Sequence, residues 1–394
     1  MESKKIKIIR IQSRIVIGGP ALHTICLAGN LDTNRFETVL VGGSGDEDES
    51  SMIAEARRRN IDCVDIPELG RDIHFYDDLI SFFKIYNLIR KIRPAIVHTH
   101  TAKAGAIGRL AAYIAGVPFI YHTFHGHVFT GYFNPVKTKL FIFIERVLAK
   151  LSTKIIVISR KQRNDIVETF KIAPHEKVAL IPLGFDWRIT DGQERDRTEF
   201  KKKYRVPENK TVIAIVGRIV PIKDHLLFLK IASELIRTDK DKFHFMIVGD
   251  GEMREMIERK VNEDGLNHFF TFTGWITDTN ILYNNIDILL LTSKNEGTPV
   301  TIIEALAYGV PVIARDVGGV ADIYDFYDRE YLINGADPLQ FVAAIKKVVG
   351  RNLAISEETK KNICTFYSAG RLISDMEKLY LDLWSINDKI EKNK

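Results

Sequence analysis

The sequence is poor in cysteine. Its three cysteines, Cys26, Cys63 and Cys364, are far apart and odd in number among 394 residues. Neither a disulfide framework nor the close cysteine spacing of a zinc site follows from them. This scarcity excludes the small disulfide-stapled folds and favours a reducing compartment.

Long hydrophobic runs are missing as well. The apolar run at residues 140–144 is far shorter than the ~20 residues that a membrane span needs. The first residues, Met-Glu-Ser-Lys-Lys, lead directly into a strand pattern, without the apolar core and cleavage site of a signal peptide. We therefore expect a cytoplasmic protein. Low-complexity tracts and repeats of 20 to 50 residues are also absent, which excludes solenoids.

Charge is distributed unevenly along the chain. The net charge is +5, yet residues 1–180 hold 26 Lys and Arg against 18 Asp and Glu, and the remainder is slightly acidic. Between residues 79 and 164, fourteen basic residues accompany one acidic residue, Glu145. A solvated face normally mixes the two signs. The block predicts an anionic partner, either an anionic membrane surface or a phosphate-bearing acceptor, and no nucleic acid.

A helix predicted over residues 135–151 lies inside this basic block. It mixes Lys and Arg with Leu, Ile and Phe. That composition is typical of a helix on a membrane surface, and such a protein would be peripheral on the inner face of the plasma membrane. A core helix surrounded by apolar residues has the same composition, so both interpretations stay open.

Short β-branched segments alternate with amphipathic helical stretches along most of the chain. Strands are predicted at residues 6–11, 37–41, 62–66, 95–98, 118–122, 154–158 and 178–182, and again at 211–216, 243–248, 269–273, 286–291 and 310–314. The helices between them include 77–91, 103–115, 225–237 and 252–262. Strands alternating with helices predict βαβ units and parallel sheets.

The length and a polar interruption indicate two domains. Single cores stop growing at about 250 to 300 residues, and polarity rises sharply over residues 185–210. We predict an α/β protein with Rossmann-like domains at 1–184 and 211–370, a linker at 185–210 and a C-terminal helix at 371–394. Leu372, Met376, Leu379 and Leu383 would share one face of that helix.

The stretch from Ser293 to Val320 organises the second domain. Thr298 is predicted as the N-cap of a helix over residues 299–308, with Pro299 in its first turn and Gly309 beyond its end. The preceding apolar strand suggests that this helix begins at the carboxyl edge of a sheet. A helix N-terminus there is predicted to bind an anion.

Two carboxylates flank the predicted helix N-terminus. Glu296 precedes the helix, and Glu304 lies roughly 9 Å along its axis at ~1.5 Å per residue. A sugar nucleotide fits this spacing, with its diphosphate at the loop Gly297–Val300, its hexose at Glu296 and its ribose at Glu304. The alternative interpretation is that Glu296 is simply a charged residue in a loop and that Glu304 is present because glutamate favours helix formation.

Two cations follow the first strand of the second domain. Gly217 and Arg218 end that strand, and Lys223 comes five residues after the arginine. A guanidinium and an ammonium at this edge would stabilise the negative charge of a departing diphosphate. The alternative is that Lys223 is a surface lysine in a loop and that Arg218 belongs to an ion pair at the strand end.

Glycine turns mark further strand ends. Gly18 and Gly19 precede the first helix and permit close approach of the backbone to phosphate or sugar, although no GxGxxG fingerprint is present. Gly251, after the strand 243–248, and Trp275, after the strand 269–273, are predicted to approach the nucleotide. Plain turns remain the other explanation.

Histidines gather at the strand end over residues 121–129. His122, His125 and His127 are close in sequence, but no acidic or cysteine ligand accompanies them, and no metal is predicted. His98 and His100 are interpreted as packing or acceptor-side residues. The Asp-x-Asp of residues 46–48 lies in an acidic run with no strand before it, so a solvated loop is expected there.

The motif Glu296-x7-Glu304, inside EGTPVTIIEALAYGVPVIA, resembles that of the family 4 retaining glycosyltransferases. The resemblance covers nearly the whole chain and is densest over residues 217–319. It implies the GT-B fold, in which two Rossmann-like domains face each other across a cleft, the first for the acceptor and the second for the donor. It also implies that the C-terminal helix returns to the first domain.

The resemblance further implies the chemistry. A hexose or N-acetylhexosamine would pass from a nucleotide sugar, expected to be UDP-linked, to a glycan or polyprenyl-linked acceptor in surface polysaccharide assembly. Transfer would be retaining, by front-face attack, without a metal or other cofactor. His125 is similar in position to a histidine that contacts the transferred sugar, and His127 is the second choice. Gly217, Arg218 and Lys223 resemble the phosphate-binding set.

Two other function classes are weighed against this one. A sugar-nucleotide epimerase can share the same two-domain fold, but it needs acid and base carboxylates where mainly His125 is found. A non-catalytic anion-binding or membrane-surface protein would not require the full set of Arg218, Lys223, Glu296 and Glu304.

Overall fold

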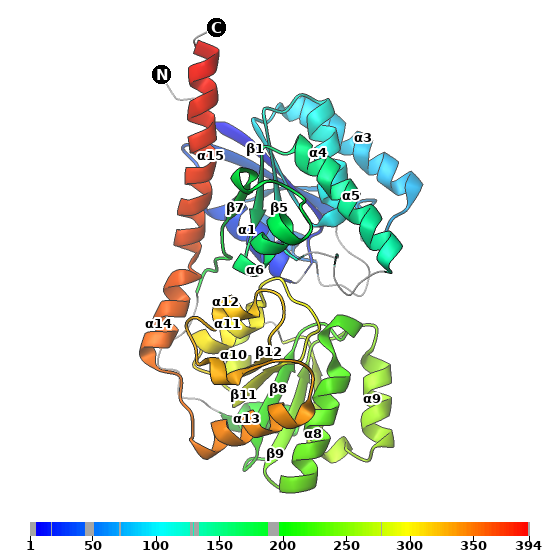
Figure 1. Ribbon diagram of the computed structural model, residues 1–394, viewed down its shortest axis with the longest axis vertical. Coiled ribbons are helices and arrows are strands. Elements are labelled where there is room, and N and C mark those ends of the chain that lie inside the picture. Colours follow the sequence, from blue (N-terminus) through cyan, green and yellow to red (C-terminus); the bar gives the residue numbers. More distant parts are fainter. Residues whose placement is uncertain are drawn as a thin grey trace. The chain divides into compact units, whose positions relative to one another are not determined.

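The computed structural model describes residues 5–16, 18–43, 51–70, 72–126, 129, 134–187, 197–276 and 278–392, with side chains described up to Trp384. His127 and residues 46–48, both discussed above, lie outside this part. The chain divides into two compact units (Figure 1). The N-terminal unit comprises Met1–Asp186 with Tyr367–Lys394, and the C-terminal unit comprises Trp187–Phe366.

The N-terminal unit is built on a seven-stranded parallel sheet. The strand order is β3-β2-β1-β4-β5-β6-β7. Its strands are β1 (Ile6–Arg14), β2 (Phe36–Gly43), β3 (Asp62–Asp65), β4 (Ile96–His100), β5 (Phe119–Phe124), β6 (Lys154–Val157) and β7 (Val178–Leu180). Its helices are α1 (Gly19–Asn30), α2 (Ile53–Arg58), α3 (Phe75–Ile92), α4 (Ala102–Ile114), α5 (Pro135–Leu151), α6 (Arg160–Asn164) and α15 (Ala369–Lys392).

The two faces of this sheet are covered by different helices, as the alternation along β1 shows. Ile8 packs in a cluster with residues of α1 and α15, whereas Ile9 and Ile11 pack in a cluster with α3 and α4. Successive side chains of a strand point to opposite faces, so a buried parallel strand is apolar throughout. Arg10 breaks this rule on the α15 side, where it is fully buried.

The C-terminal unit repeats the architecture with six parallel strands. The order is β10-β9-β8-β11-β12-β13. Its strands are β8 (Thr211–Val216), β9 (Phe243–Val248), β10 (Phe270–Gly274), β11 (Ile288–Leu291), β12 (Val312–Arg315) and β13 (Leu332–Ile333). Its helices are α7 (Arg197–Tyr204), α8 (His225–Asp239), α9 (Arg254–Glu263), α10 (Thr279–Tyr283), α11 (Val300–Ala307), α12 (Val320–Ile323), α13 (Pro338–Gly350) and α14 (Glu357–Phe366).

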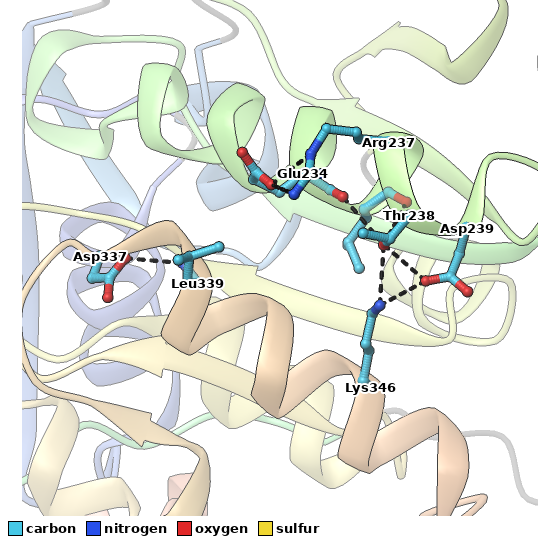
Figure 2. Close-up of polar contacts among 8 residues, drawn as sticks. Glu234, Arg237, Thr238, Asp239, Asp337, Leu339 and Lys346 are labelled. Atoms are coloured by element: carbon cyan, nitrogen blue, oxygen red, sulfur yellow. Dashed lines mark hydrogen bonds and ion pairs between the residues drawn. The ribbon is translucent and has the colours of Figure 1, made fainter.

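Helices α8 and α13 of this unit are joined at the surface by polar contacts (Figure 2). Lys346 of α13 donates to Thr238 Oγ1 at 3.0 Å and lies 2.7 Å from a carboxylate oxygen of Asp239, both at the end of α8. Asp337 caps α13 by accepting from the Leu339 amide at 3.0 Å. Exposed pairs of this kind contribute little stability, so buried apolar contacts hold the two helices.

Most strands and helices lie where the sequence pattern places them, but three differences stand out. The short strand β13 has no sequence prediction, because two residues are too few to show a period. The predicted linker at 185–210 contains helix α7. The C-terminal segment that belongs to the N-terminal unit begins at Tyr367, before the predicted residue 371.

Helix α15 is attached to its unit mainly through apolar side chains. Leu372, Met376 and Tyr380 are buried against β1, β4, β5 and α1, and Leu379 and Leu383 pack beside them. The face predicted from the sequence is therefore the buried one, with Tyr380 added to it.

We expect Leu372→Ala to destabilise the N-terminal unit by about 2 to 5 kcal/mol, because Leu372 is fully buried and its removal leaves a cavity. Lys346→Ala is the control, since its partners are exposed. Thermal unfolding followed by circular dichroism should show a lower Tm for Leu372→Ala and little change for Lys346→Ala. Equal shifts in both variants would contradict this account of how α15 is attached.

Candidate functional site

The C-terminal unit has its topological switch point between β8 and β11. These strands are neighbours in the sheet, and the chain leaves them toward opposite sides. Ligands of open α/β sheets bind beyond the carboxyl ends of the strands at such a point. Here those ends carry the loops at residues 217–224 and 292–299, which contain half of the predicted site residues.

Backbone hydrogen bonds hold these two loops together. The Lys294 amide donates to Ile222 O at 2.8 Å, and Thr292 Oγ1 donates to Lys223 O at 2.9 Å. Lys223 ends a short 3-10 turn, and Asp224 then adopts a left-handed conformation with φ 52°. The backbone at Lys223 is thus held by the loop after β11 as well as by its own loop.

Lys223 and Glu296 form an ion pair across the loops. Lys223 Nζ lies 2.6 Å from Glu296 Oε1, and Ser293 Oγ donates to the same oxygen at 2.6 Å. The side chains are only 23% and 11% exposed, so solvent screens the pair weakly. The sequence pattern predicts a phosphate as the partner of Lys223 and a sugar as the partner of Glu296. In the structure, these two side chains are partners of each other.

Gly318 makes room for the backbone of Glu296. It has φ +55°, and a Cβ at this position would lie 1.7 Å from Glu296 O. The next amide, of Gly319, donates to Gly297 O at 2.9 Å. The turn after β12 therefore supports the glutamate loop. Sequence reasoning included these glycines in the organising stretch without assigning them a role.

Helix α11 begins one residue later than predicted, and Thr298 is not its N-cap. The helix spans Val300–Ala307, and Pro299 occupies the N-cap position with φ −72° and no side-chain capping bond. Proline fixes its own φ near that value and has no amide to satisfy, so it can stand just before the first turn. The helix still starts directly after the Glu296 loop.

Glu304 is held by a tyrosine that the sequence did not identify. Tyr283 Oη donates to Glu304 Oε2 at 2.8 Å, and the Tyr283 ring stacks on Tyr308 with centroids 5.5 Å apart. Burial raises the pKa of Glu304 to about 7, and the tyrosine hydrogen bond opposes that shift. No signal in the sequence marks Tyr283, because its role depends on α10 lying beside α11.

Three other predicted donor residues, Gly217, Gly251 and Trp275, follow strands of the same unit, whereas Gly18 and Gly19 belong to the N-terminal unit. Gly217 follows β8, and its amide donates to Val248 O at 2.9 Å. Arg218 is the next residue. A Cβ on Gly251 would lie 2.6 Å from Ile219 O, so close packing of the two loops explains this glycine without a ligand. Trp275 follows β10 and is 39% exposed.

Histidines from three elements meet in the N-terminal unit. His100 ends β4, His125 follows β5, and His23 lies on α1. His100 Nδ1 is 3.0 Å from His125 Nε2, and the His23 ring lies edge-on to both. Gly18 and Gly19 stand at the start of α1, where Gly18 is the N-cap.

Two further histidines beside this group have other partners. His98 contacts Arg10, Tyr380 and Thr123 through its two nitrogens. His122 faces the opposite side of the sheet, where Nδ1 lies 2.9 Å from Thr99 Oγ1. The set that is close in space is therefore His23, His100 and His125, rather than the sequence neighbours His122 and His125.

These histidines are neutral at pH 7. Burial is the largest cause that lowers the pKa of His23, His98, His100 and His122, and it lowers that of His125 to about 3. Desolvation penalises the charged imidazolium. As placed, the group acts through neutral imidazole nitrogens.

Several basic residues of the block at residues 79–164 are paired with other groups within the fold. Arg109 is fully buried, and its Nη2 donates to both carboxylate oxygens of Glu145, at 2.8 and 3.0 Å. Lys103 pairs with Asp78, and Arg146 donates to backbone oxygens at the end of η1 (Asp165–Thr169). The charge count therefore overstated the free positive charge, because pairing across elements cannot be read from sequence spacing.

The outer side of α3, α4 and α5 exposes many large apolar side chains. The three helices pack in that order, and Figure 1 shows them together on one side of the N-terminal unit. We call this surface the apolar helix face, and it consists of Ile73, Phe75, Tyr76, Leu79, Ile80, Phe83, Leu110, Tyr113, Ile114, Val136, Leu140, Phe143, Ile144 and Val147. No helix in the described part of the chain is both long and apolar enough to cross a bilayer.

Comparison with known families covers both units. Residues 17–187 match the family described as Glycosyltransferase Family 4, and residues 196–363 match Glycosyl transferases group 1. The chain is 26% identical over 389 residues to an Escherichia coli UDP-Gal:alpha-D-GlcNAc-diphosphoundecaprenol alpha-1,3-galactosyltransferase, covering 96% of this chain and 97% of that protein. It is 26% identical over 344 residues to the Staphylococcus aureus capsular polysaccharide biosynthesis glycosyltransferase CapM, covering 84% and 88%.

Solved structures share the fold. A glycosyltransferase from Rickettsia africae superposes with a TM-score of 0.76 at 20% identity, covering 96% of this chain and 99% of that one. Anabaena HepE, in complex with UDP and glucose, superposes with a TM-score of 0.80 at 16% identity, covering 96% and 100%.

These findings define the protein as a glycosyltransferase with the two-domain GT-B fold. The two parallel-sheet units and the carboxylates at the start of α11 agree with that class. The chain belongs to the family 4 glycosyltransferases, as the motif of Glu296 and Glu304 predicted.

The environment of Glu304 generates a prediction about its titration. In Tyr283→Phe the hydrogen bond that favours the carboxylate is lost, so the pKa of Glu304 should rise above about 7. The carboxyl carbon signal of labelled glutamate, assigned by its absence from Glu304→Gln, measures the midpoint. A midpoint that falls, or does not move, would show that Tyr283 does not stabilise the ionised form.

Proposed function

We propose that this protein moves a hexose or N-acetylhexosamine from a UDP-sugar to a polyprenyl-linked or glycan acceptor, in surface polysaccharide assembly on the cytoplasmic side of the membrane. The observation that supports the proposal best is the Lys223–Glu296 pair in front of α11, with Glu304 further along the same helix. The E. coli relative is named for a UDP-Gal donor and a diphosphoundecaprenol acceptor. Anabaena HepE binds UDP and glucose.

The donor diphosphate would bind at the start of α11. Lys223 and Arg218 both belong to the loop after β8, which backbone bonds tie to the loop that carries Glu296. In the absence of the donor, Glu296 balances the charge of Lys223. A bound diphosphate adds negative charge beside the lysine, which then stabilises the leaving group most when the glycosidic bond breaks. Because Lys223 and Arg218 would stabilise the charge of the leaving diphosphate, we propose that transfer needs no metal ion.

The two glutamates would bind the sugars of the donor. Glu296 is oriented by Lys223 and Ser293, and its carboxylate can accept hydrogen bonds from hexose hydroxyls. Glu304, held by Tyr283, would accept from the ribose hydroxyls. The loop Gly297–Val300 lies between them.

Retention of configuration would follow from front-face attack. The acceptor hydroxyl bonds to the anomeric carbon on the face that the diphosphate leaves, and it gives its proton to the departing phosphate oxygen. No enzyme nucleophile is needed for that sequence, and Glu296 stabilises the positive charge that develops on the sugar. His125 is proposed to contact the transferred sugar.

Lys223→Ala should lower kcat by about 10²- to 10³-fold and change the donor KM much less, because the charge it stabilises is largest in the transition state. Lys294→Ala is the matched control in the neighbouring loop, since its side chain is half-exposed and lies 3.9 Å from Asp224. Steady-state kinetics with a UDP-sugar checks this. A large rise in KM at constant kcat would reduce Lys223 to a donor-binding residue.

The acceptor proposed here is tethered to a lipid, and the apolar helix face offers a way to reach it. We propose that this face, together with basic residues such as Lys139 and Lys150, docks on an anionic membrane surface. Phe75 and Phe143 are 75% and 63% exposed, which is unusual for large apolar side chains in contact with water. Partial insertion of such side chains and attraction of basic ones to anionic lipid act together.

Sedimentation with anionic vesicles at low salt tests the docking surface. The wild-type protein should pellet with the vesicles, and the double variant Phe75→Ser with Phe143→Ser should bind roughly tenfold more weakly or worse, because two apolar anchors are lost. Leu339→Ser, at a 58% exposed site on α13, is the control and should bind like the wild type. If the wild-type protein does not bind the vesicles at low salt, the membrane proposal is wrong. The proposed transfer reaction would not be affected by that result.

A further inference from the structure

The three histidines of the N-terminal unit lie at its own topological switch point. Strands β1, β4 and β5 are consecutive in the sheet, His100 ends β4 and His125 follows β5. His23 lies on α1, which follows β1, so all three rings approach the same carboxyl edge. His23 and His100 are almost completely buried, at 1% and 0% exposed, whereas His125 is partly exposed.

The geometry of the three rings is close to that of a metal site. One ligand nitrogen from each of His23, His100 and His125 can be chosen so that all lie within 4.8 Å of one another. The ring centroids are 4.9, 5.2 and 5.8 Å apart. A tetrahedral ion bound to nitrogens at about 2.0 to 2.1 Å holds three imidazole centroids roughly 5 Å apart.

Several of these buried nitrogens lack a hydrogen-bond partner among the described residues. Both nitrogens of His23 and Nε2 of His100 are in this position. Leaving such a group buried and unpaired lowers the stability of the folded protein. His98, in the same neighbourhood, has partners at both nitrogens. Arg10 Nε and Nη2, near the group, and both nitrogens of His225 in the other unit also lack a partner, so what distinguishes His23 and His100 is that their nitrogens converge with one of His125.

The donor set itself points to a metal ion. Uncharged imidazole nitrogens bind metal ions, whereas an anion would have to be held by the buried guanidinium of Arg10. Arg10 is buried near the group and weakens cation binding, so an ion with a strong preference for imidazole nitrogen is required.

We propose that His23, His100 and His125 form a binding site for a late first-row transition metal ion, with Zn²⁺ the ion that their nitrogen-only donor set fits. Zinc accepts three histidine nitrogens in tetrahedral sites that keep a fourth position open. The partly exposed His125 side is the entry path. None of the three residues belongs to the C-terminal unit, which carries the proposed diphosphate cations.

His125 would be both a zinc ligand and a residue that contacts the transferred sugar. Its Nε2 already faces His100, so a bound ion would fix the ring in that orientation. The inference concerns binding alone, and it does not depend on the proposed transfer reaction.

Titration of metal-free protein with Co²⁺ tests the proposal directly. We expect one equivalent to give the intense visible absorption of tetrahedral Co²⁺, and Zn²⁺ to displace it. His23→Gln should weaken Co²⁺ binding by at least about tenfold. Two matched controls should bind like the wild type: His122→Gln, a buried neighbour bonded to Thr99, and His244→Gln, a buried strand histidine of the other unit.

Each outcome bears on the proposal. No tetrahedral Co²⁺ signal in the wild type, or equal binding by wild type and His23→Gln, would overturn it, as would equal loss in His122→Gln. If His23→Gln does not fold, the X-ray absorption spectrum of zinc-loaded wild type decides. Three imidazole nitrogens at about 2.0 Å support the site, and any other shell overturns it.

Discussion

The ion pair between Lys223 and Glu296 is the contact on which the proposed donor site depends. It joins two loops that leave neighbouring strands and that backbone bonds also connect. Glu296 can hold its position only because Gly318 leaves its carbonyl oxygen space. A lysine without this partner would be a mobile surface charge. With the partner, it is a fixed positive charge beside the start of α11.

Much of the fold follows from hydrophobic periodicity, because parallel strands buried on both faces are continuously apolar. β8 and β9 match their predicted bounds, as does α5. Errors occur at element ends. The start of α11 was misplaced by one residue because composition favours Thr298 as the N-cap and Pro299 in the first turn, and only the backbone geometry places Pro299 at the N-cap. β13 is too short to carry a pattern.

The donor site in the C-terminal unit was predictable where its residues come from one loop or one helix, as Glu296 and Glu304 do. Tyr283, beside Glu304, and His23, beside His125 in the other unit, were missed because each comes from a separate element whose packing has no local signature. The basic block was interpreted wrongly in part, because charge counts do not show pairing between residues that are distant in sequence. Arg109 and Glu145 are 36 residues apart, and they pair in the interior, so Arg109 adds no charge to the surface.

The two units use their switch points in opposite electrostatic ways. In the C-terminal unit, Lys223 faces Glu296, and Glu304 lies further along α11, which suits a ligand that arrives with phosphate charge and sugar hydroxyls. In the N-terminal unit, burial lowers the pKa of the histidines, and the Arg10 guanidinium lies near them. The imidazoles add no positive charge to that of Arg10. We therefore propose phosphate recognition at this edge of the sheet in the C-terminal unit and metal ligation by imidazole nitrogens in the N-terminal unit.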